Sequence, residues 1–204
     1  MVISFGRRHI FAALSGILGS LALAISFNPS VAAFTASIAN SNSAGSGTVS
    51  LQETSGATVC NSTDGGSIST NSATCTTINK YGGNLAMVPG QAVTTTVTFT
   101  NAGTSPIQNF TLTPGSCTQS TNGTVNGTAI DLCSKLQLTI ASGATTVFSG
   151  TATSFAASPA ISLAAPLAAG GTQSYTFTVT LDSAAGNTYQ GLKASQPMTW
   201  SASN

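Results

Sequence analysis

Apolar and polar residues alternate at every second position over much of this chain after residue 33. The alternation is clearest in residues 93–100 (VTTTVTFT) and 173–181 (QSYTFTVTL), which are rich in β-branched and aromatic residues. A period of two residues is typical of β-strands with one buried face. It places on the buried faces Val93, Val97 and Phe99 in the first strand and Tyr175, Phe177, Val179 and Leu181 in the second.

Shorter segments of the same kind predict further strands, and turn-forming residues separate them. These strands are expected at residues 48–52, 110–112, 135–140, 145–148 and 197–201. Residues 155–169 are rich in Ala but contain two prolines, so they predict a strand and connections, or at most one helical turn. Many short strands between Gly, Asn, Ser and Pro clusters favour an all-β, jelly-roll-like antiparallel β-sandwich over residues 48–204, following an N-terminal signal helix.

Residues 1–33 have the pattern of a secretory signal peptide. Positive residues at 7–9 precede an apolar run over residues 10–27, and small residues at 31–33 predict cleavage between Ala33 and Phe34. The alternative is a retained membrane anchor, but the apolar run is at the short limit of the roughly 20 residues that a spanning helix needs. The sequence therefore predicts a secreted protein that meets the membrane only through its uncleaved leader.

Charged residues make up 4% of the chain, and both arginines and the single histidine lie in the predicted leader. A chain without His or Arg is poorly equipped for acid–base catalysis near neutral pH and for binding phosphate or nucleic acid. We therefore predict no enzyme activity, no cofactor, no metal site and no nucleic-acid partner. The remaining acids, Glu53 and Asp131 among them, are interpreted as solvated single charges, with calcium binding by Asp64 and Asp182 as a minor alternative.

Four cysteines remain in the exported part of the chain, which predicts disulfides. Three connectivities are possible, and zinc binding would need closer spacings. We favour one bridge between Cys60 and Cys75 and another between Cys117 and Cys133, because each pair flanks a turn-rich stretch.

Three short motifs occur in order along the chain: Ala32-Ala33-Phe34, Val88-Pro89-Gly90 before a strand ending in Asn101-Ala102-Gly103, and Asn187-Thr188-Tyr189-Gln190-Gly191 before the last strand. In this order they resemble the TasA/camelysin family of exported bacterial proteins, which are associated with biofilm matrix and with cell or spore surfaces. The resemblance implies a jelly-roll domain that assembles into extracellular fibres. Some members of the family are described as metalloproteases, but no H-E-x-x-H motif occurs here, so that activity is not expected. The four cysteines lie outside the motifs.

The resemblance also implies that the segment freed by signal-peptide removal inserts as a strand into the next subunit. Here that donor strand is residues 34–40, in which Phe34, Ala36 and Ile38 share one face. A Ser-, Gly- and Asn-rich hinge over residues 40–47 follows. The alternative is that residues 34–39 form the first strand of their own sheet. We therefore expect a structural subunit that self-associates into filaments in the extracellular matrix or at the cell surface of a bacterium, with the cell wall or other matrix components as further partners.

A second class of function is a monomeric cell-surface adhesion or glycan-binding module. Such modules on β-sandwiches use aromatic side chains as stacking platforms. Tyr81, between Lys80 and Gly82, is the aromatic residue expected to be most exposed, whereas Tyr175 and Trp200 are expected in the core.

Overall fold

The structure is a computed structural model that describes residues 37–204. The chain divides into two units, Met1–Ala44 and Gly45–Asn204, and we call the second the folded unit. Of the first unit, residues 37–44 are described; they form neither helix nor strand. The predicted signal helix and the cleavage position between Ala33 and Phe34 lie outside the described residues. Within residues 37–204, no helix is long and apolar enough to cross a membrane.

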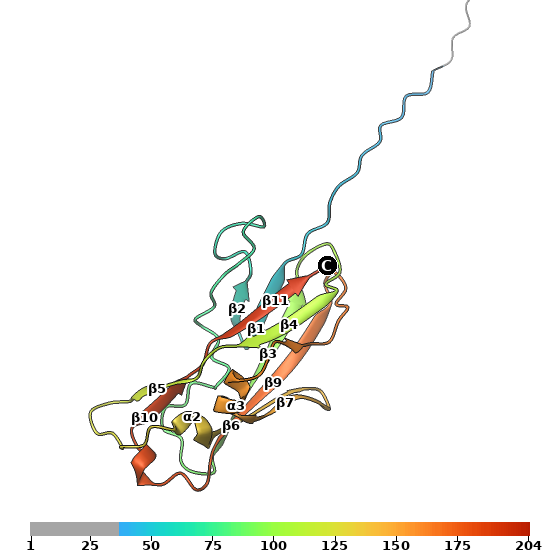
Figure 1. Ribbon diagram of the computed structural model, residues 1–204. Helices are drawn as coiled ribbons and strands as arrows, with labels where there is room; N and C mark the ends of the chain where they lie inside the picture. The colour runs from blue at the N-terminus through green and yellow to red at the C-terminus, as the bar shows by residue number, and fades with distance from the viewer. Residues whose placement is uncertain (1–36) are drawn as a thin grey trace, which may run out of the picture. The chain divides into compact units, whose positions relative to one another are not determined.

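The folded unit is built almost entirely of β-strands (Figure 1). Among the described residues the strands are β1 (Leu51–Ser55), β2 (Thr58–Asn61), β3 (Ala92–Asn101), β4 (Asn109–Pro114), β5 (Thr118–Thr121), β6 (Leu136–Ser142), β7 (Thr145–Thr151), β8 (Ile161–Ser162), β9 (Thr172–Leu181), β10 (Leu192–Ser195) and β11 (Met198–Ser203). The helical segments are α2 (Leu132–Lys135), α3 (Ala152–Ala156) and the 3-10 turn η1 (Asn187–Tyr189).

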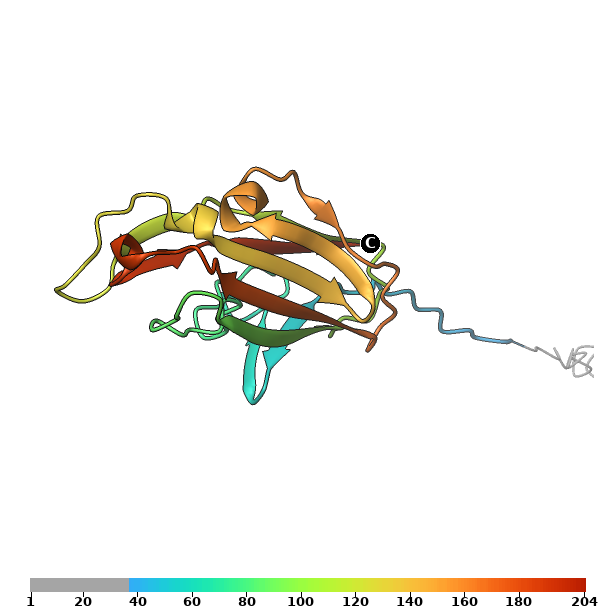
Figure 2. The ribbon, with the colours of Figure 1, turned by 90° about the horizontal axis from the view of Figure 1, so that it is seen from below.

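The strands form antiparallel sheets in two layers. One layer is a six-stranded sheet in the order β2-β1-β3-β9-β6-β7. The other contains the three-stranded sheet β11-β4-β8 and the pair β10-β5. Figure 2 shows β4 and β11 lying opposite β3, β9 and β6. The predicted all-β antiparallel sandwich is therefore confirmed.

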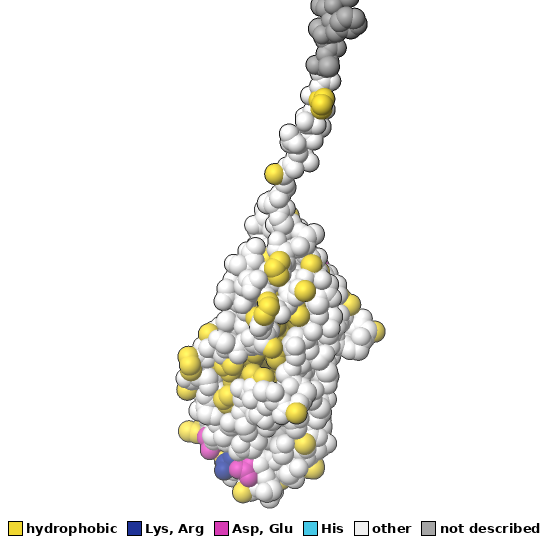
Figure 3. Space-filling model, turned by 90° about the vertical axis from the view of Figure 1, so that its right-hand side faces the viewer, with side chains coloured by type: hydrophobic (Ala, Val, Ile, Leu, Met, Phe, Trp, Pro, Cys, Tyr) yellow, Lys and Arg dark blue, Asp and Glu magenta, His cyan; other side chains and the backbone are white. Residues whose placement is uncertain are grey.

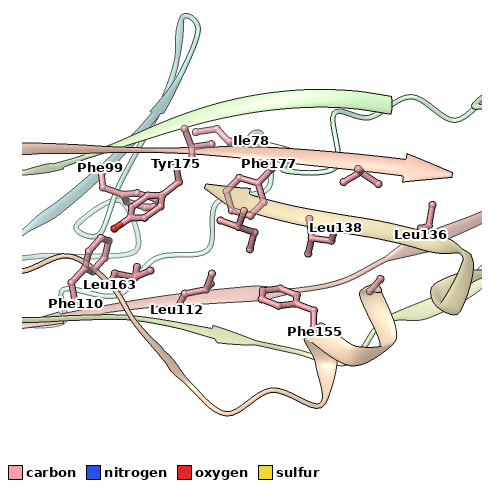
Figure 4. Close-up of a cluster of buried hydrophobic side chains, with 14 of the residues drawn as sticks. Ile78, Phe99, Phe110, Leu112, Leu136, Leu138, Phe155, Leu163, Tyr175 and Phe177 are labelled. Atoms are coloured by element: carbon pink, nitrogen blue, oxygen red, sulfur yellow. The ribbon is translucent and has the colours of Figure 1, made fainter. Parts of the chain in front are cut away.

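The core lies between the inner faces of the two layers. The strands β3 and β9 pair along their whole lengths, from Ala92 opposite Thr180 to Thr100 opposite Thr172. The residues that the alternation predicted to be buried in their central parts are at most 1% exposed: Val97, Phe99, Tyr175, Phe177 and Val179. They face Phe110 and Leu112 of β4 in the second layer, and Phe155 of α3 belongs to the same cluster (Figure 4). Complete burial of one such side chain contributes roughly 1.5–3 kcal/mol, so this cluster holds the two layers together.

The outer face of the six-stranded sheet is covered by hydroxyl groups. Across β3 and β9, Thr94 faces Thr178, Thr96 faces Thr176 and Thr98 faces Ser174, with hydroxyl oxygens 3.5, 3.2 and 2.7 Å apart. Among the described residues, the positions of β1, β3, β9 and β6 on this outer face carry no charged side chain. Figure 3 shows another side of the folded unit, where the visible charged side chains lie at one end and apolar ones gather in the middle.

Several elements differ from the sequence prediction. The first strand begins at Leu51 rather than Thr48, because the backbone of Thr48 and Ser50 bonds to the turn after β3 (Thr104 N to Thr48 O, 2.9 Å; Ala102 N to Ser50 O, 2.8 Å). Residues 155–169 contain the end of α3 and the two-residue strand β8, in line with the expected single helical turn. The strands β2, β5 and β10 were not predicted: β2 and β5 lack a regular apolar alternation, and β10 alternates over only four residues.

Candidate functional site

A groove of about 1020 Å³ lies between the two layers of the folded unit. One wall is formed by β1, β3 and β9, where Leu51, Phe99 and Val179 face the groove. The other wall is formed by β10 and β11. Much of the irregular segment between β2 and β3, residues 62–91, also lines the groove. We treat this groove as the candidate functional site.

The wall formed by β10 and β11 has an open backbone edge. Within residues 37–204, β11 pairs only with β4 and β10 pairs only with β5. Gly115 N–H donates to Pro197 O (2.8 Å) and Asn122 N–H donates to Gly191 O (2.7 Å), so the odd-numbered residues bond toward β4 and β5. The even-numbered residues therefore direct their N–H and C=O groups to the groove side: Leu192, Ala194, Met198, Trp200 and Ala202. This edge is a template for one more strand.

The groove also contains a buried polar atom that lacks a partner. Trp200 packs against Phe99 in a tilted arrangement, with ring centroids 4.2 Å apart and an interplanar angle of 41°, and its Nε1 has no hydrogen-bond partner among the described residues. A buried, unsatisfied N–H group costs about 1–3 kcal/mol.

An ion pair lies at the wall formed by β1. Glu53 and Lys80 both line the groove, with Lys80 Nζ 2.5 Å from Glu53 Oε1 and side chains 8% and 12% exposed. The contact is an ion pair rather than an aligned hydrogen bond. The prediction that Glu53 is a solvated single charge is therefore wrong. The sequence did contain a signal for the burial of Glu53: it lies two residues after Leu51, and residues two apart on a strand share one face.

Tyr81 connects the 62–91 segment to the opposite wall. Its hydroxyl donates to Gln196 Oε1, and Gln196 Nε2 donates in turn to Gly115 O (2.8 Å) and Ala152 O (3.3 Å). Burial raises the pKa of the Tyr81 hydroxyl above its usual range. The sequence suggested Tyr81 as the most exposed of the aromatic residues considered; it is half-buried and hydrogen-bonded to Gln196 rather than freely exposed.

Both favoured disulfides form. The Cα atoms of Cys60 and Cys75 are 5.9 Å apart, and those of Cys117 and Cys133 are 6.1 Å apart. The first bridge anchors the 62–91 segment to β2, beside the groove. No free cysteine and no group of three or more His, Cys, Asp or Glu side chains suited to a metal ion occurs in residues 37–204.

The residues of the two internal motifs shape turns and the ends of strands. Gly90, preceded by Pro89, has φ +81° and donates to Leu181 O (2.8 Å), which fixes the start of β3. Asn101, fully buried, donates to Ser105 O and Leu167 O and accepts from Gly103 N–H. At Gly103 a Cβ would lie 2.2 Å from the carbonyl oxygen of Thr48, so only glycine allows this approach.

The last motif shapes the turn before β10. Asn187 and Tyr189 belong to η1, Gln190 follows it, and Gly191 has φ +64°. The Tyr189 hydroxyl donates to Asp131 Oδ1 (2.7 Å), so Asp131, like Glu53, has a specific partner that the sequence did not indicate. This hydrogen bond lowers the pKa of the Asp131 carboxyl and raises that of the Tyr189 hydroxyl.

The predicted donor strand is only partly described. Phe34 and Ala36 lie outside the described residues. Residues 37–39 belong to no strand, and Ile38 is 89% exposed.

The chain matches no model of a known protein family and no curated protein sequence. The resemblance to the TasA/camelysin family therefore rests on the short motifs described above.

Proposed function

We propose that the chain is a secreted structural subunit of an extracellular matrix or surface fibre, assembling head-to-tail by donation of residues 34–39 to the groove of the next copy. The observation that carries the proposal is the open edge of β10 and β11 along an apolar groove. An extended peptide that adds to a sheet edge gains main-chain hydrogen bonds, and pockets for alternate side chains supply the specificity.

The groove and the donor segment are matched in length and chemistry. The open edge runs along β10 (Leu192–Ser195) and β11 (Met198–Ser203), so an extended segment of about six residues can pair with parts of both strands and cross the junction between them. Phe34 and Ile38 would each gain roughly 1.5–3 kcal/mol on full burial.

The folded unit does not need the donor segment for its own core. Every described strand, both disulfides and the whole buried cluster lie within Gly45–Asn204. The exposed Ile38 is followed by a flexible hinge over residues 40–47. A donor segment that leaves one copy and a groove that receives it in another make a heterologous contact, which propagates into a filament when it does not close.

Secretion and processing fit this scheme. Two disulfides are compatible with an extracellular protein. Cleavage after Ala33 would start assembly, because it frees the amino-terminal segment from the membrane. The scarcity of charge leaves little repulsion between copies.

The proposal is tested by comparing a chain beginning at Phe34 with one beginning at Gly45. The shorter chain retains the complete folded unit. We expect filaments from the longer chain by negative-stain microscopy, and a monomer from the shorter chain by size-exclusion chromatography. If both chains remain monomeric, or both polymerise equally, strand donation is wrong.

A matched pair of substitutions separates burial from general changes in the tail. Ile38→Asp places a charge on the face expected to enter the groove, whereas Ser37→Asp places the same charge on the opposite face. We expect Ile38→Asp to abolish filaments and Ser37→Asp to retain them. Equal effects of the two substitutions would contradict the assignment of the buried face.

A further inference from the structure

Two adjacent side chains of the 62–91 segment reach opposite walls of the groove. Lys80 forms its ion pair with Glu53 of β1. The Tyr81 hydroxyl donates a hydrogen bond to Gln196, which lies between β10 and β11. Within the described residues, no other side-chain hydrogen bond or ion pair joins residues 79–82 to either wall. We call Lys80 and Tyr81 the clasp.

Both attachment points of the clasp are firmly held. Glu53 lies in β1, which pairs with β2 on one side and β3 on the other. Gln196 is fixed by its two hydrogen bonds to backbone carbonyls, one at Gly115 just after β4 and one in α3. The clasp therefore connects two rigid walls.

The turn that carries the clasp is also fixed in place. Tyr81 N–H donates to Asn79 Oδ1 (2.9 Å), and Gly82 N–H donates to Asn79 O (3.0 Å). Gly82 has φ +76°, and a Cβ there would lie 2.2 Å from a side-chain carbon of Val93, at the start of β3. If the groove opens, the side-chain contacts of the clasp should therefore break before the backbone of this turn moves.

The clasp lies in the path of an added strand. Gln196 sits between Ala194 and Met198, whose backbone groups face the groove. A strand that pairs along this edge past the junction of β10 and β11 meets the Tyr81 side chain, which also lines the groove. We propose that the clasp regulates the groove: the contact of Tyr81 with Gln196 holds it closed, and a strand binds only the open form. This inference rests on the proposed function, because the ligand is the donor strand of a second copy.

The expected size of the effect follows from the population of the open form. When only a fraction of molecules can bind, the apparent dissociation constant is the intrinsic one divided by that fraction. One hydrogen bond contributes about 0.5–1.5 kcal/mol net, so its removal raises a small open fraction by about 2- to 10-fold. Tyr81→Phe deletes the hydroxyl and keeps the ring.

The first test measures opening without any strand. Trp200 is the only tryptophan of the chain and lines the groove, so quenching of its fluorescence by acrylamide reports access. In the chain beginning at Gly45, we expect Tyr81→Phe to increase the quenching constant. Thr98→Val is the matched control, since it deletes one hydroxyl from a 2.7 Å contact on the outer face of β3. An unchanged quenching constant for Tyr81→Phe, or an equal increase for Thr98→Val, would overturn the clasp.

The second test adds a synthetic peptide of residues 34–44 to the same proteins. We expect Tyr81→Phe to bind it about 2- to 10-fold more tightly than the unsubstituted protein, with Thr98→Val unchanged. If quenching increases but no protein binds the peptide, the clasp stands as a feature of the groove while strand donation fails. If the peptide binds equally to all three proteins, strand donation stands and regulation by the clasp is wrong.

Discussion

Replacement of Asn101 by alanine probes the most densely bonded polar side chain in the core. Asn101 ends β3 and is fully buried. Its Nδ2 donates to Ser105 O (2.8 Å) and Leu167 O (3.0 Å), and its Oδ1 accepts from Gly103 N–H (3.0 Å). Asn101→Ala would remove all three bonds and leave the two carbonyls and the N–H without these partners.

The expected cost follows from those three bonds. At about 0.5–1.5 kcal/mol net for each hydrogen bond, the free energy of unfolding should fall by about 2–4 kcal/mol. For a domain of roughly 150–250 residues, 1 kcal/mol shifts the Tm by about 2–4 °C, so a decrease of roughly 4–16 °C is expected. Urea denaturation of the oxidised folded unit measures the loss directly, and an unchanged slope against urea would show that the unfolded state is unaffected.

Asn109→Ala is the matched control. The Asn109 side chain is exposed and makes one 3.4 Å contact with Ser203 Oγ, so its removal should cost less than about 0.5 kcal/mol. A loss below about 1 kcal/mol for Asn101→Ala, or a loss equal to that of the control, would refute the role assigned to the buried amide.

Three further predictions concern the same unit. Gly103→Ala should destabilise it by about 1–3 kcal/mol in urea denaturation, because the new Cβ would meet backbone atoms of the segment before β1; a neutral substitution would contradict this close approach. Replacing both Cys117 and Cys133 by serine opens a loop with a sequence separation of 16 and should cost about 3 kcal/mol in the same assay, whereas unchanged stability would rule out this constraint on the unfolded chain. Because the hydrogen bond from Tyr189 lowers the folded-state pKa of Asp131, its stabilising effect should be complete above the unfolded pKa of about 3.9 and lost as the pH falls through the lower folded value. In acid titrations followed by circular dichroism, Tyr189→Phe should therefore lose less stability than the unsubstituted protein below pH about 4, and parallel curves would exclude the coupling.

The elements that sequence predicts best are those whose side chains alternate regularly. β3 and β9 were expected at residues 93–100 and 173–181 and extend one or two residues beyond, because each combines a buried apolar face with a threonine face. The pairs Cys60–Cys75 and Cys117–Cys133 could be favoured because each pair flanks one turn-rich stretch. These are local patterns, readable without knowledge of the sheet order.

The groove could not be read from the sequence, because segments far apart along the chain form it. Its open edge belongs to β10 and β11, while its other wall belongs to β1, β3 and β9. The contact between Tyr81 and Gln196 joins residues 115 positions apart. The pairing of Glu53 with Lys80 depends on the path of the irregular 62–91 segment, which carries no periodic signal.

The threonine face of the six-stranded sheet determines how interactions through this side of the protein depend on salt concentration. The described outward side chains of β1, β3, β9 and β6 bear no formal charge, so dissolved ions have nothing there to screen. Contact with any neighbour through this face depends on hydroxyl groups and methyl groups, whose interactions respond little to ionic strength. The interactions of this face should therefore be nearly the same in dilute buffer and in sea water.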